Sequence, residues 1–279
     1  MTNNSILDQT RYALFNTTGP RYDMITPVFG PLAKSLVKLA ALKPEEHVLD
    51  LGTGTGAAVF PAGRFAHRVA GIDYAPTMLA GAMKIAQEAQ LKNVVFCQGD
   101  MHRLPHAVNC FEVALASFGL NGIDATRVFP EVWRVLKHGG RLVFQEWGEV
   151  DDASKLVKQT VQAHKVNQAE GFLADLRRLG ERKRAWDKLG GPEAIADLLQ
   201  QVGFSQVRTA IEREAIPLEP LTFYRYKTAW TPYQTELAAM SPPARKTVET
   251  TVVETLRSWT ESNGRFIWQP ELVRMIAWK

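Results

Sequence analysis

The sequence predicts an α/β fold, a mostly parallel seven-stranded sheet with helices on both faces. Residues 46–51 read as a short buried strand, three closely spaced glycines follow, and residues 57–62 can open a helix, which together start a βαβ unit. Apolar strands and helix signals then alternate to residue 147, and a final antiparallel strand is expected to end near Trp278. Helical insertions are expected in addition to the strands and helices of this sheet.

The glycines of the turn Gly52-Thr-Gly54-Thr-Gly56 predict a cradle for a ligand, because glycine is needed where the backbone takes positive φ or approaches a ligand closely. With Ala57 the turn also fits G-x-G-x-x-A, so an NAD or FAD site is an open alternative, and an ordinary tight turn is another. Asp50 at the end of the strand favours a cationic ligand, since a pyrophosphate would meet a like charge there.

The next elements follow in regular order. Pro76 suits the first turn of a helix, and a second helix is expected from Asp124 to Leu136, followed by a turn at 137–140. The further strands are expected at 68–73, 94–97, 111–116 and 141–146.

The motif Asp50-x-Gly52-x-Gly54-x-Gly56 resembles the first motif of the class I S-adenosylmethionine (SAM)-dependent methyltransferases. Residues 20–147 are similar, motif by motif, to the small-molecule methyltransferases of the ubiquinone and menaquinone biosynthesis type (type 11). The resemblance implies a Rossmann-like core, SAM as cofactor with S-adenosylhomocysteine as product, and no metal.

Acidic residues close the second and third strands. Asp73 stands about twenty residues past the glycines, where a carboxylate is expected to hold both ribose hydroxyls; capping the following helix is its alternative role. The resemblance implies that Asp100 and Met101 contact the adenine and that Tyr22, in the element 19–23, covers the sulfonium. The full set of expected cofactor contacts is Tyr22, Asp50, Gly52, Thr53, Gly54, Gly56, Asp73, Tyr74, Met78, Asp100, Met101, Ser117 and Phe118.

The sequence assigns no catalytic residue. Positioning of the two reactants supplies much of the rate in methyl transfer, so a base is optional. Weak candidates for a base are His102, His164 and Tyr22. The two histidines are weak candidates because a lone histidine is more often a loop residue than a catalyst.

The expected organisation has four parts. A helical cap at 1–45 precedes the SAM-binding core at 46–150, and a helical lid is inserted at 151–190. Residues 191–279 complete the core, with a strand at 206–216, helices at about 220–262 broken by Pro242-Pro243, and the last strand at 264–278. Aromatic residues at 223–233 fit either a roof over an apolar acceptor or ordinary core packing.

Composition and charge limit the binding partners and the cellular location that the sequence predicts. The 279 residues carry a net charge of +4, and Glu181 interrupts the basic stretch 177–184, so nucleic acid is a minor alternative. No apolar run reaches the ~20 residues of a membrane span, and the polar start does not resemble a signal peptide, which predicts a cytoplasmic protein. Two cysteines without metal-ligand spacing predict free thiols. The oligomeric state stays open, with a homodimer as one option.

These observations predict an enzyme that transfers a methyl group from SAM to carbon or oxygen of a small hydrophobic or aromatic metabolite. An NAD- or FAD-dependent oxidoreductase using the same glycine turn is the alternative from another class. A non-catalytic SAM-binding partner protein is the third.

Overall fold

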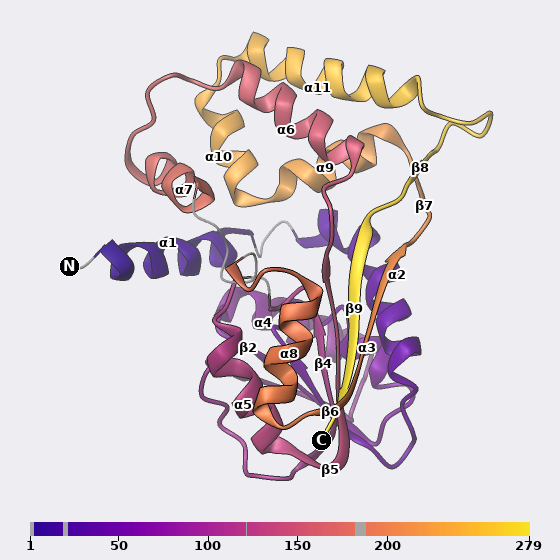
Figure 1. Cartoon of the computed structure of the whole chain (residues 1–279). Coiled ribbons are helices and arrows are strands. Elements are labelled where there is room, and N and C mark those ends of the chain that lie inside the picture. Colours follow the sequence, from indigo (N-terminus) through magenta and orange to yellow (C-terminus); the bar gives the residue numbers. More distant parts are fainter. Residues whose placement is uncertain (1–2, 19–21, 121, 182–187) are drawn as a thin grey trace. The chain divides into compact units, whose positions relative to one another are not determined.

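The computed structural model describes residues 3–18, 22–120, 122–181 and 188–279. Its helices and strands alternate along the first half of the chain, and helices dominate the second half (Figure 1). The helices are α1 (Asn3–Thr18), α2 (Tyr22–Ala40), α3 (Val59–Ala62), α4 (Pro76–Glu88), α5 (Ala125–Val135), α6 (Asp152–His164), α7 (Gly171–Glu181), α8 (Pro192–Val202), α9 (Pro220–Ala229), α10 (Thr231–Ala239) and α11 (Pro242–Arg257). The strands are β1 (His47–Leu51), β2 (Arg68–Asp73), β3 (Val94–Gln98), β4 (Phe111–Ser117), β5 (Leu136–Trp147), β6 (Ser205–Arg213), β7 (Ile216–Leu218), β8 (Phe266–Trp268) and β9 (Glu271–Trp278).

The chain forms two compact units, each assembled from separate segments. The sheet unit comprises Phe29–Trp147, Lys183–Glu212 and Leu272–Lys279. The helical unit comprises Met1–Val28, Gly148–Arg182 and Arg213–Glu271.

The seven-stranded sheet has the order β3-β2-β1-β4-β5-β9-β6. Strands β1 to β5 pair in parallel, and β9 runs antiparallel to β5, with Arg141 opposite Trp278. This confirms the predicted fold class. The strand order reverses between β1 and β4, and in open α/β sheets ligands bind outside the carboxyl ends of the strands at such a point.

Alternating side chains of β1 explain how both faces of the sheet are covered. Val48 points into a core that it shares with helices α2 and α3, whereas Leu49 and Leu51 point into the opposite core with α5 and α8. Because successive side chains in a strand point to opposite faces, a continuous apolar run is what a doubly covered parallel strand requires. The carboxyl ends of the strands are thereby held in fixed register.

Two expected strands are divided differently in the structure. The strand predicted at 206–216 splits into β6, which joins the large sheet, and β7, which pairs antiparallel with β8 in a small sheet of the helical unit. The strand predicted at 264–278 likewise splits into β8 and β9 around Pro270, whose ring removes a backbone donor. The turn expected at 137–140 is an irregular start of β5, with Gly139 at φ +77°.

The helical unit packs its helices mainly against one another. Helix α11 contacts α6 and α9, and α10 contacts α1 and α7. Arg177 on α7 forms a bidentate ion pair with Glu236 on α10 at 2.6 and 2.7 Å, and Thr18 shares a hydrogen bond of 2.7 Å with Thr231. Helix α10 ends at Ala239 and α11 begins at Pro242, so the predicted break at the proline pair is confirmed.

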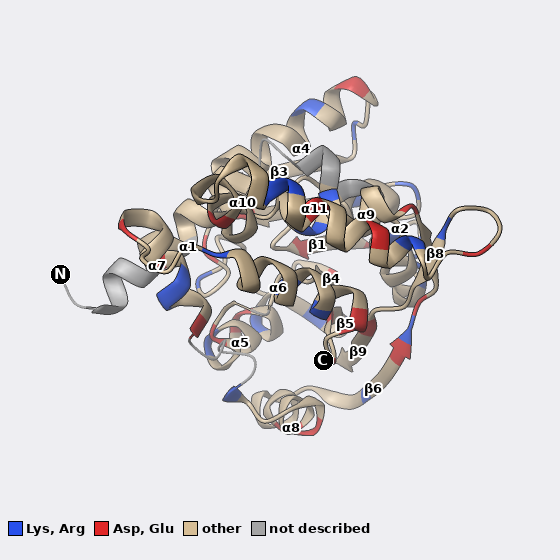
Figure 2. Ribbon diagram, turned by 90° about the horizontal axis from the view of Figure 1, so that it is seen from above, with Lys and Arg blue, Asp and Glu red and all other residues tan. Residues whose placement is uncertain are grey.

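The charges of α11 have both signs, as Figure 2 shows, with Lys246 paired to Glu249 and Arg257 paired to Glu254. The basic stretch at 177–184 lies partly outside the described residues, since 182–184 belong to a segment that the structure leaves undescribed. Within the described part of the chain, no helix combines the length and apolar character needed to cross a membrane.

A buried ion pair fastens the end of α2 to β5 and supports a stability prediction. Glu46 accepts hydrogen bonds from Arg141 at 2.7 and 3.0 Å, and the Arg141 guanidinium also donates to the Ala40 carbonyl. We expect Glu46→Ala to lower the free energy of unfolding by about 3 kcal/mol, because it leaves a buried cation uncompensated. Urea denaturation measures this change. The exposed pair of Glu254 and Arg257 provides the control, and Glu254→Ala should cost less than about 1 kcal/mol. Equal losses in the two variants would contradict the prediction.

Candidate active site

The carboxyl ends of the parallel strands bring together most of the residues predicted from sequence. Asp50 lies at the end of β1, Asp73 ends β2, and Asp100 lies two residues beyond β3. Ser117 ends β4, where it pairs with Gln145 of β5. All of these positions belong to the sheet unit and to one edge of its sheet.

The glycine cradle has the conformation that its sequence predicts. Gly52, Gly54 and Gly56 take φ values of +65°, +54° and +89°. The cradle uses its own backbone donors: Thr53 N donates to Ile72 O at 3.0 Å, Gly54 N donates to Asp73 Oδ2 at 2.9 Å, and Gly56 N donates to Thr53 O at 2.9 Å. These three N–H groups therefore hold the turn together.

A second turn, after β4, presses against the cradle. A Cβ atom added to Gly119 would lie 2.5 Å from the Leu51 carbonyl oxygen, and one added to Gly52 would lie 3.0 Å from the Gly119 Cα atom. The two backbones approach so closely that both positions exclude a side chain. The residues that follow β4 are thus fixed directly beside the cradle.

Asp50 and Asp73 are buried carboxylates with raised pKa values. Asp50 is 2% exposed; burial raises its pKa to about 7, the hydrogen bond from Thr53 Oγ1 at 2.7 Å opposes the rise, and the neighbouring charge of Asp73 adds to it. Burial also raises the pKa of Asp73, and backbone hydrogen bonds from Ala75 and Gly54 oppose that rise. Two desolvated carboxylates beside one cradle favour a cationic ligand.

Asp100 is held by His102. His102 donates to Asp100 Oδ1 from its backbone N at 2.9 Å, and its Nδ1 lies 2.6 Å from the same oxygen. Burial would raise the pKa of Asp100, but the hydrogen bonds from His102 outweigh it and keep the pKa below its usual value. His102 Nε2 accepts a hydrogen bond from the Asp124 backbone N–H at 3.2 Å, so its basic lone pair is engaged in this arrangement.

An aromatic cluster stands next to the turn that follows β4. The rings of Phe118 and Trp147 stack at 4.0 Å with an interplanar angle of 16°. Phe29 meets both edge-on, with centroid distances of 5.1 Å to Phe118 and 5.8 Å to Trp147. Phe118 and Trp147 remain half-buried at the carboxyl end of the sheet.

The other predicted residues are distributed more widely. Met101 is buried in the core and approaches the cradle, since its Cε atom lies 3.5 Å from a Cβ added to Gly52. Met78 is only 2% exposed on α4, and Ser117 Oγ accepts a hydrogen bond from Gln145. Tyr22 is the first residue of α2, but its side chain, residues 19–21 and Asn121 lie outside the described residues.

His164, the second candidate base, ends α6 in the helical unit. Its Nδ1 lies 2.9 Å from the Thr160 carbonyl oxygen, so Nδ1 carries the hydrogen and Nε2 is the basic nitrogen. Phe223 and Tyr226, from the predicted aromatic region, are buried against Trp268 and pack inside the same unit. Ordinary core packing therefore accounts for these two rings.

Sequence reasoning missed Phe29, Trp147 and Gly119. Trp147 could have been found, because it ends the strand predicted at 141–146 and the carboxyl ends of parallel strands meet at one edge. Phe29 carries no such signal, since its partner rings lie far away along the sequence.

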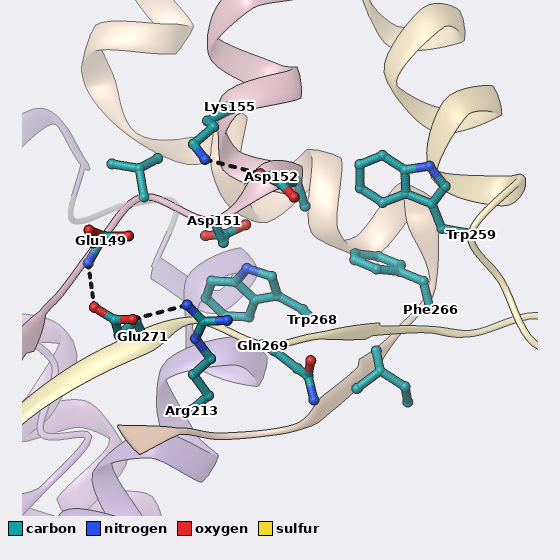
Figure 3. Close-up of a pocket in the computed structure, with 13 residues that line it drawn as sticks. Glu149, Asp151, Asp152, Lys155, Arg213, Trp259, Phe266, Trp268, Gln269 and Glu271 are labelled. Atoms are coloured by element: carbon teal, nitrogen blue, oxygen red, sulfur yellow. Dashed lines mark hydrogen bonds and ion pairs between the residues drawn. The ribbon is translucent and has the colours of Figure 1, made fainter. Parts of the chain in front are cut away.

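The helical unit contains a cavity of about 300 Å³ with walls of both charge signs (Figure 3). Glu271 accepts hydrogen bonds from Gly148 N through its carbonyl oxygen at 2.8 Å and from Glu149 N through Oε1 at 3.0 Å, and pairs with Arg213 at 3.1 Å. The hydrogen bond from Glu149 and the Arg213 cation hold the pKa of Glu271 below its usual value. Glu271 thus connects the segment after β5 to Arg213, the last residue of β6.

The site fits SAM better than a dinucleotide. A pyrophosphate needs donors from the glycine turn and from the start of a following helix. Here Thr53, Gly54 and Gly56 direct their N–H groups internally, and α3 has only four residues. The two buried carboxylates would repel phosphate but suit the cationic methionyl end of SAM. Sheet order and cradle together define the Rossmann-like methyltransferase class.

Comparisons with known proteins agree. A family model described as a methyltransferase domain matches residues 42–197, more than half of the chain. Demethylmenaquinone methyltransferase of Thermus thermophilus is 32% identical over 205 residues, covering 69% of this chain and 91% of the relative. Malonyl-[acyl-carrier protein] O-methyltransferase of Herminiimonas arsenicoxydans is 26% identical over 210 residues, covering 74% and 71%. The crystal structure of YcgJ from Bacillus subtilis superposes with a TM-score of 0.56 at 20% identity, covering 88% of this chain and 97% of that one, and supports the fold.

The chain belongs to the class I SAM-dependent methyltransferases and is similar to their quinone-biosynthesis group. It is an enzyme that uses SAM as cofactor. The predicted recognition, cofactor and activity are confirmed. The relatives favour neither the oxidoreductase alternative nor the non-catalytic one.

Proposed function

We propose that this methyltransferase modifies carbon or oxygen of a planar hydrophobic acceptor related to the precursors of isoprenoid quinones. The observation that supports this most is the similarity to demethylmenaquinone methyltransferase, which extends over 91% of that relative. The stacked and half-buried rings of Phe118 and Trp147 at the carboxyl end of the sheet suit such an acceptor.

The residues at the carboxyl edge receive proposed roles toward SAM. Asp73 binds the ribose hydroxyls, Asp100 accepts the adenine amino group, and Asp50 binds the cationic methionyl end. When bound, SAM supplies an activated methyl group with its own leaving group. Holding acceptor and methyl group in line can contribute about 7–11 kcal/mol of the barrier reduction. The rigid backbone contact between Gly52 and Gly119 supports such positioning, because it fixes the cradle against the turn after β4.

The role of a base is kept as a proposal. His102 becomes available only when the hydrogen bond from Asp124 N–H to its Nε2 breaks, whereas His164 has an accepting Nε2 in the structure as it stands. Tyr22 stays a candidate from sequence. A comparison of kcat between the wild type and the variants His102→Gln and His164→Gln would show which histidine contributes to turnover.

Calorimetric titration and a product assay test the proposed function. SAM and S-adenosylhomocysteine should bind at micromolar concentrations while NAD does not. The protein should then methylate hydroxynaphthoate or demethylmenaquinone analogues, with the methyl position read by mass spectrometry and NMR. Turnover of amines but not of these acceptors would contradict the proposed acceptor and leave the enzyme class standing.

The ribose role of Asp73 gives a direct prediction. Asp73→Ala should weaken SAM binding about tenfold or more, or roughly 1.4 kcal/mol, because it removes the proposed diol ligand and the acceptor of Gly54 N. Asp73→Asn is the matched control, since its one remaining oxygen can still accept from the cradle. Calorimetry measures both variants. Unchanged affinity in a folded Asp73→Ala protein would remove the assignment.

Three expectations from the sequence stay proposals. They are a cytoplasmic location, a homodimer, and a lid formed by residues 151–190. Light scattering after size exclusion tests the second, and hydrogen exchange of residues 151–181 with and without S-adenosylhomocysteine tests the third. We also propose that nucleic acid is not a substrate.

A further inference from the structure

Phe118 has an unusual backbone conformation for an aromatic residue. Its φ of +62° lies in the left-handed region, which bulky side chains rarely adopt. Such strain persists only where the surroundings impose it, and it concentrates at functional sites. A glycine at this position would relieve the strain, so the phenyl ring itself needs an explanation.

The surroundings of Phe118 impose its conformation through three contacts. Phe118 N donates to Gln145 O at 3.0 Å, and Leu120 N donates to the fully buried Glu146 at 2.8 Å. Between them Gly119 lies against the Leu51 carbonyl with no room for a side chain. The turn is therefore clamped on both sides, and the direction of the Phe118 ring is set by the backbone.

The strained ring is also oriented by its neighbours. Trp147 stacks on it at 4.0 Å and 16°, and the buried Phe29 supports both rings from the edge. Phe118 and Trp147 are each half-buried, and Phe118 directly precedes Gly119, whose backbone lies against the cradle. Aromatic groups bind other rings by offset stacking or edge contacts, so a preoriented pair selects flat conjugated ligands.

We propose that the Phe118–Trp147 pair is the acceptor-binding surface of the enzyme and selects an aromatic over a saturated ring. The inference rests on the proposed function, because it names the part of the chain that reads the acceptor. The sequence predicts that Phe118 contacts the cofactor, and the proposal gives the backbone and the ring of Phe118 different roles. Its backbone belongs to the turn beside the cofactor cradle, and its ring serves the acceptor.

A matched pair of probes tests the surface without turnover. 2-Naphthol and trans-decahydro-2-naphthol share a skeleton and a hydroxyl group, but only the first is aromatic. Both are titrated calorimetrically into the protein saturated with S-adenosylhomocysteine. The wild-type protein should bind 2-naphthol at least about tenfold more tightly than the saturated alcohol, a difference of roughly 1.4 kcal/mol.

Two variants separate the ring from its backbone. Phe118→Leu keeps an apolar side chain at the strained position and should bring the two affinities within about threefold, whereas Phe118→Tyr should keep the preference. Circular dichroism and the melting temperature check that both variants keep the wild-type fold. Trp147→Leu is expected to act like Phe118→Leu.

The proposal is overturned if Phe118→Leu keeps the wild-type preference, if the wild-type protein has none, or if it does not bind 2-naphthol at millimolar concentration. Failure of the proposed function looks different. In that case 2-naphthol binds with the expected preference, yet no quinone-like acceptor is methylated.

Discussion

Gly54→Val is expected to abolish SAM binding while the fold persists. Gly54 has a φ of +54°, and its N–H donates to Asp73 Oδ2. A β-branched residue is a strong outlier at this conformation, so valine would force the cradle into another shape and break its tie to Asp73. The affinity should fall about a hundredfold or more, which corresponds to at least ~2.7 kcal/mol. Calorimetry measures the loss, and circular dichroism checks the fold.

Gly30→Ala is the control for that experiment. Gly30 lies in α2, where an added Cβ meets no atom within 4 Å. Alanine in a helix interior should leave binding unchanged and stabilise the protein by up to about 1 kcal/mol. Normal SAM affinity in Gly54→Val would show that the ligand lies elsewhere.

SAM affinity is expected to fall steeply on acidification, which is the second large effect. Burial raises the pKa of Asp50 to about 7 in the free protein. A cationic ligand binds the ionised form, so affinity should decrease by about tenfold for each pH unit below 7 until Asp50 of the complex is itself protonated. Binding should release a proton near neutral pH. Titrations in buffers of different ionisation enthalpy measure that proton directly.

Asp50 has the opposite effect on the stability of the fold: acidification weakens SAM binding but stabilises the free protein. Its pKa is higher in the folded protein than the ordinary value of 3.8, so the folded state binds the proton more tightly than the unfolded chain. The stability contributed by protonated Asp50 is complete below pH ~4 and is lost as the pH rises through 7. Asp50→Asn should therefore raise the melting temperature of the free protein at pH 8 and change it little at pH 4.

Asp50→Asn also separates the two effects. The variant should bind SAM more weakly at pH 8 and with a flatter pH profile than the wild type. Asp100→Asn is a suitable comparison. The pKa of Asp100 lies below its usual value, so this carboxyl group stays ionised near neutral pH. A wild-type profile that stays flat between pH 5 and 8 would exclude Asp50 from the ligand site.

Local sequence signals were enough for most strands of the sheet and for the position of Asp73 at a strand end. Apolar runs gave β2 at its observed limits and β1, β3 and β4 within a residue of theirs. The position of Asp73 followed from its distance to the glycines. Its alternative role as a helix cap is wrong, because the N-cap of α4 is Ala75 and no side chain caps that helix; Asp73 accepts from Ala75 N before the helix begins. The proposed contact of Asp73 with the ribose stays a prediction.

Features that depend on distant partners could not be predicted. Residues 206–216 contain no glycine or proline that would mark an interruption, yet the chain changes sheets after Arg213, because β7 pairs with β8 about fifty residues away. The clustering of Phe29 with Phe118 and Trp147 arises only when α2 packs beside the ends of β4 and β5. The hydrogen bond that His102 Nε2 accepts from the Asp124 backbone N–H likewise depends on the position of the turn before α5.

The position of β9 in the sheet constrains how the protein can fold during synthesis. Residues 271–278 lie between β5 and β6, although they are made after both of those strands. Until they leave the ribosome, β5 exposes an open edge, and β6 lacks the neighbour that joins it to the sheet. The sheet unit can therefore reach its complete strand order only after residues 271–278 have been made, and until then its unpaired edges are exposed.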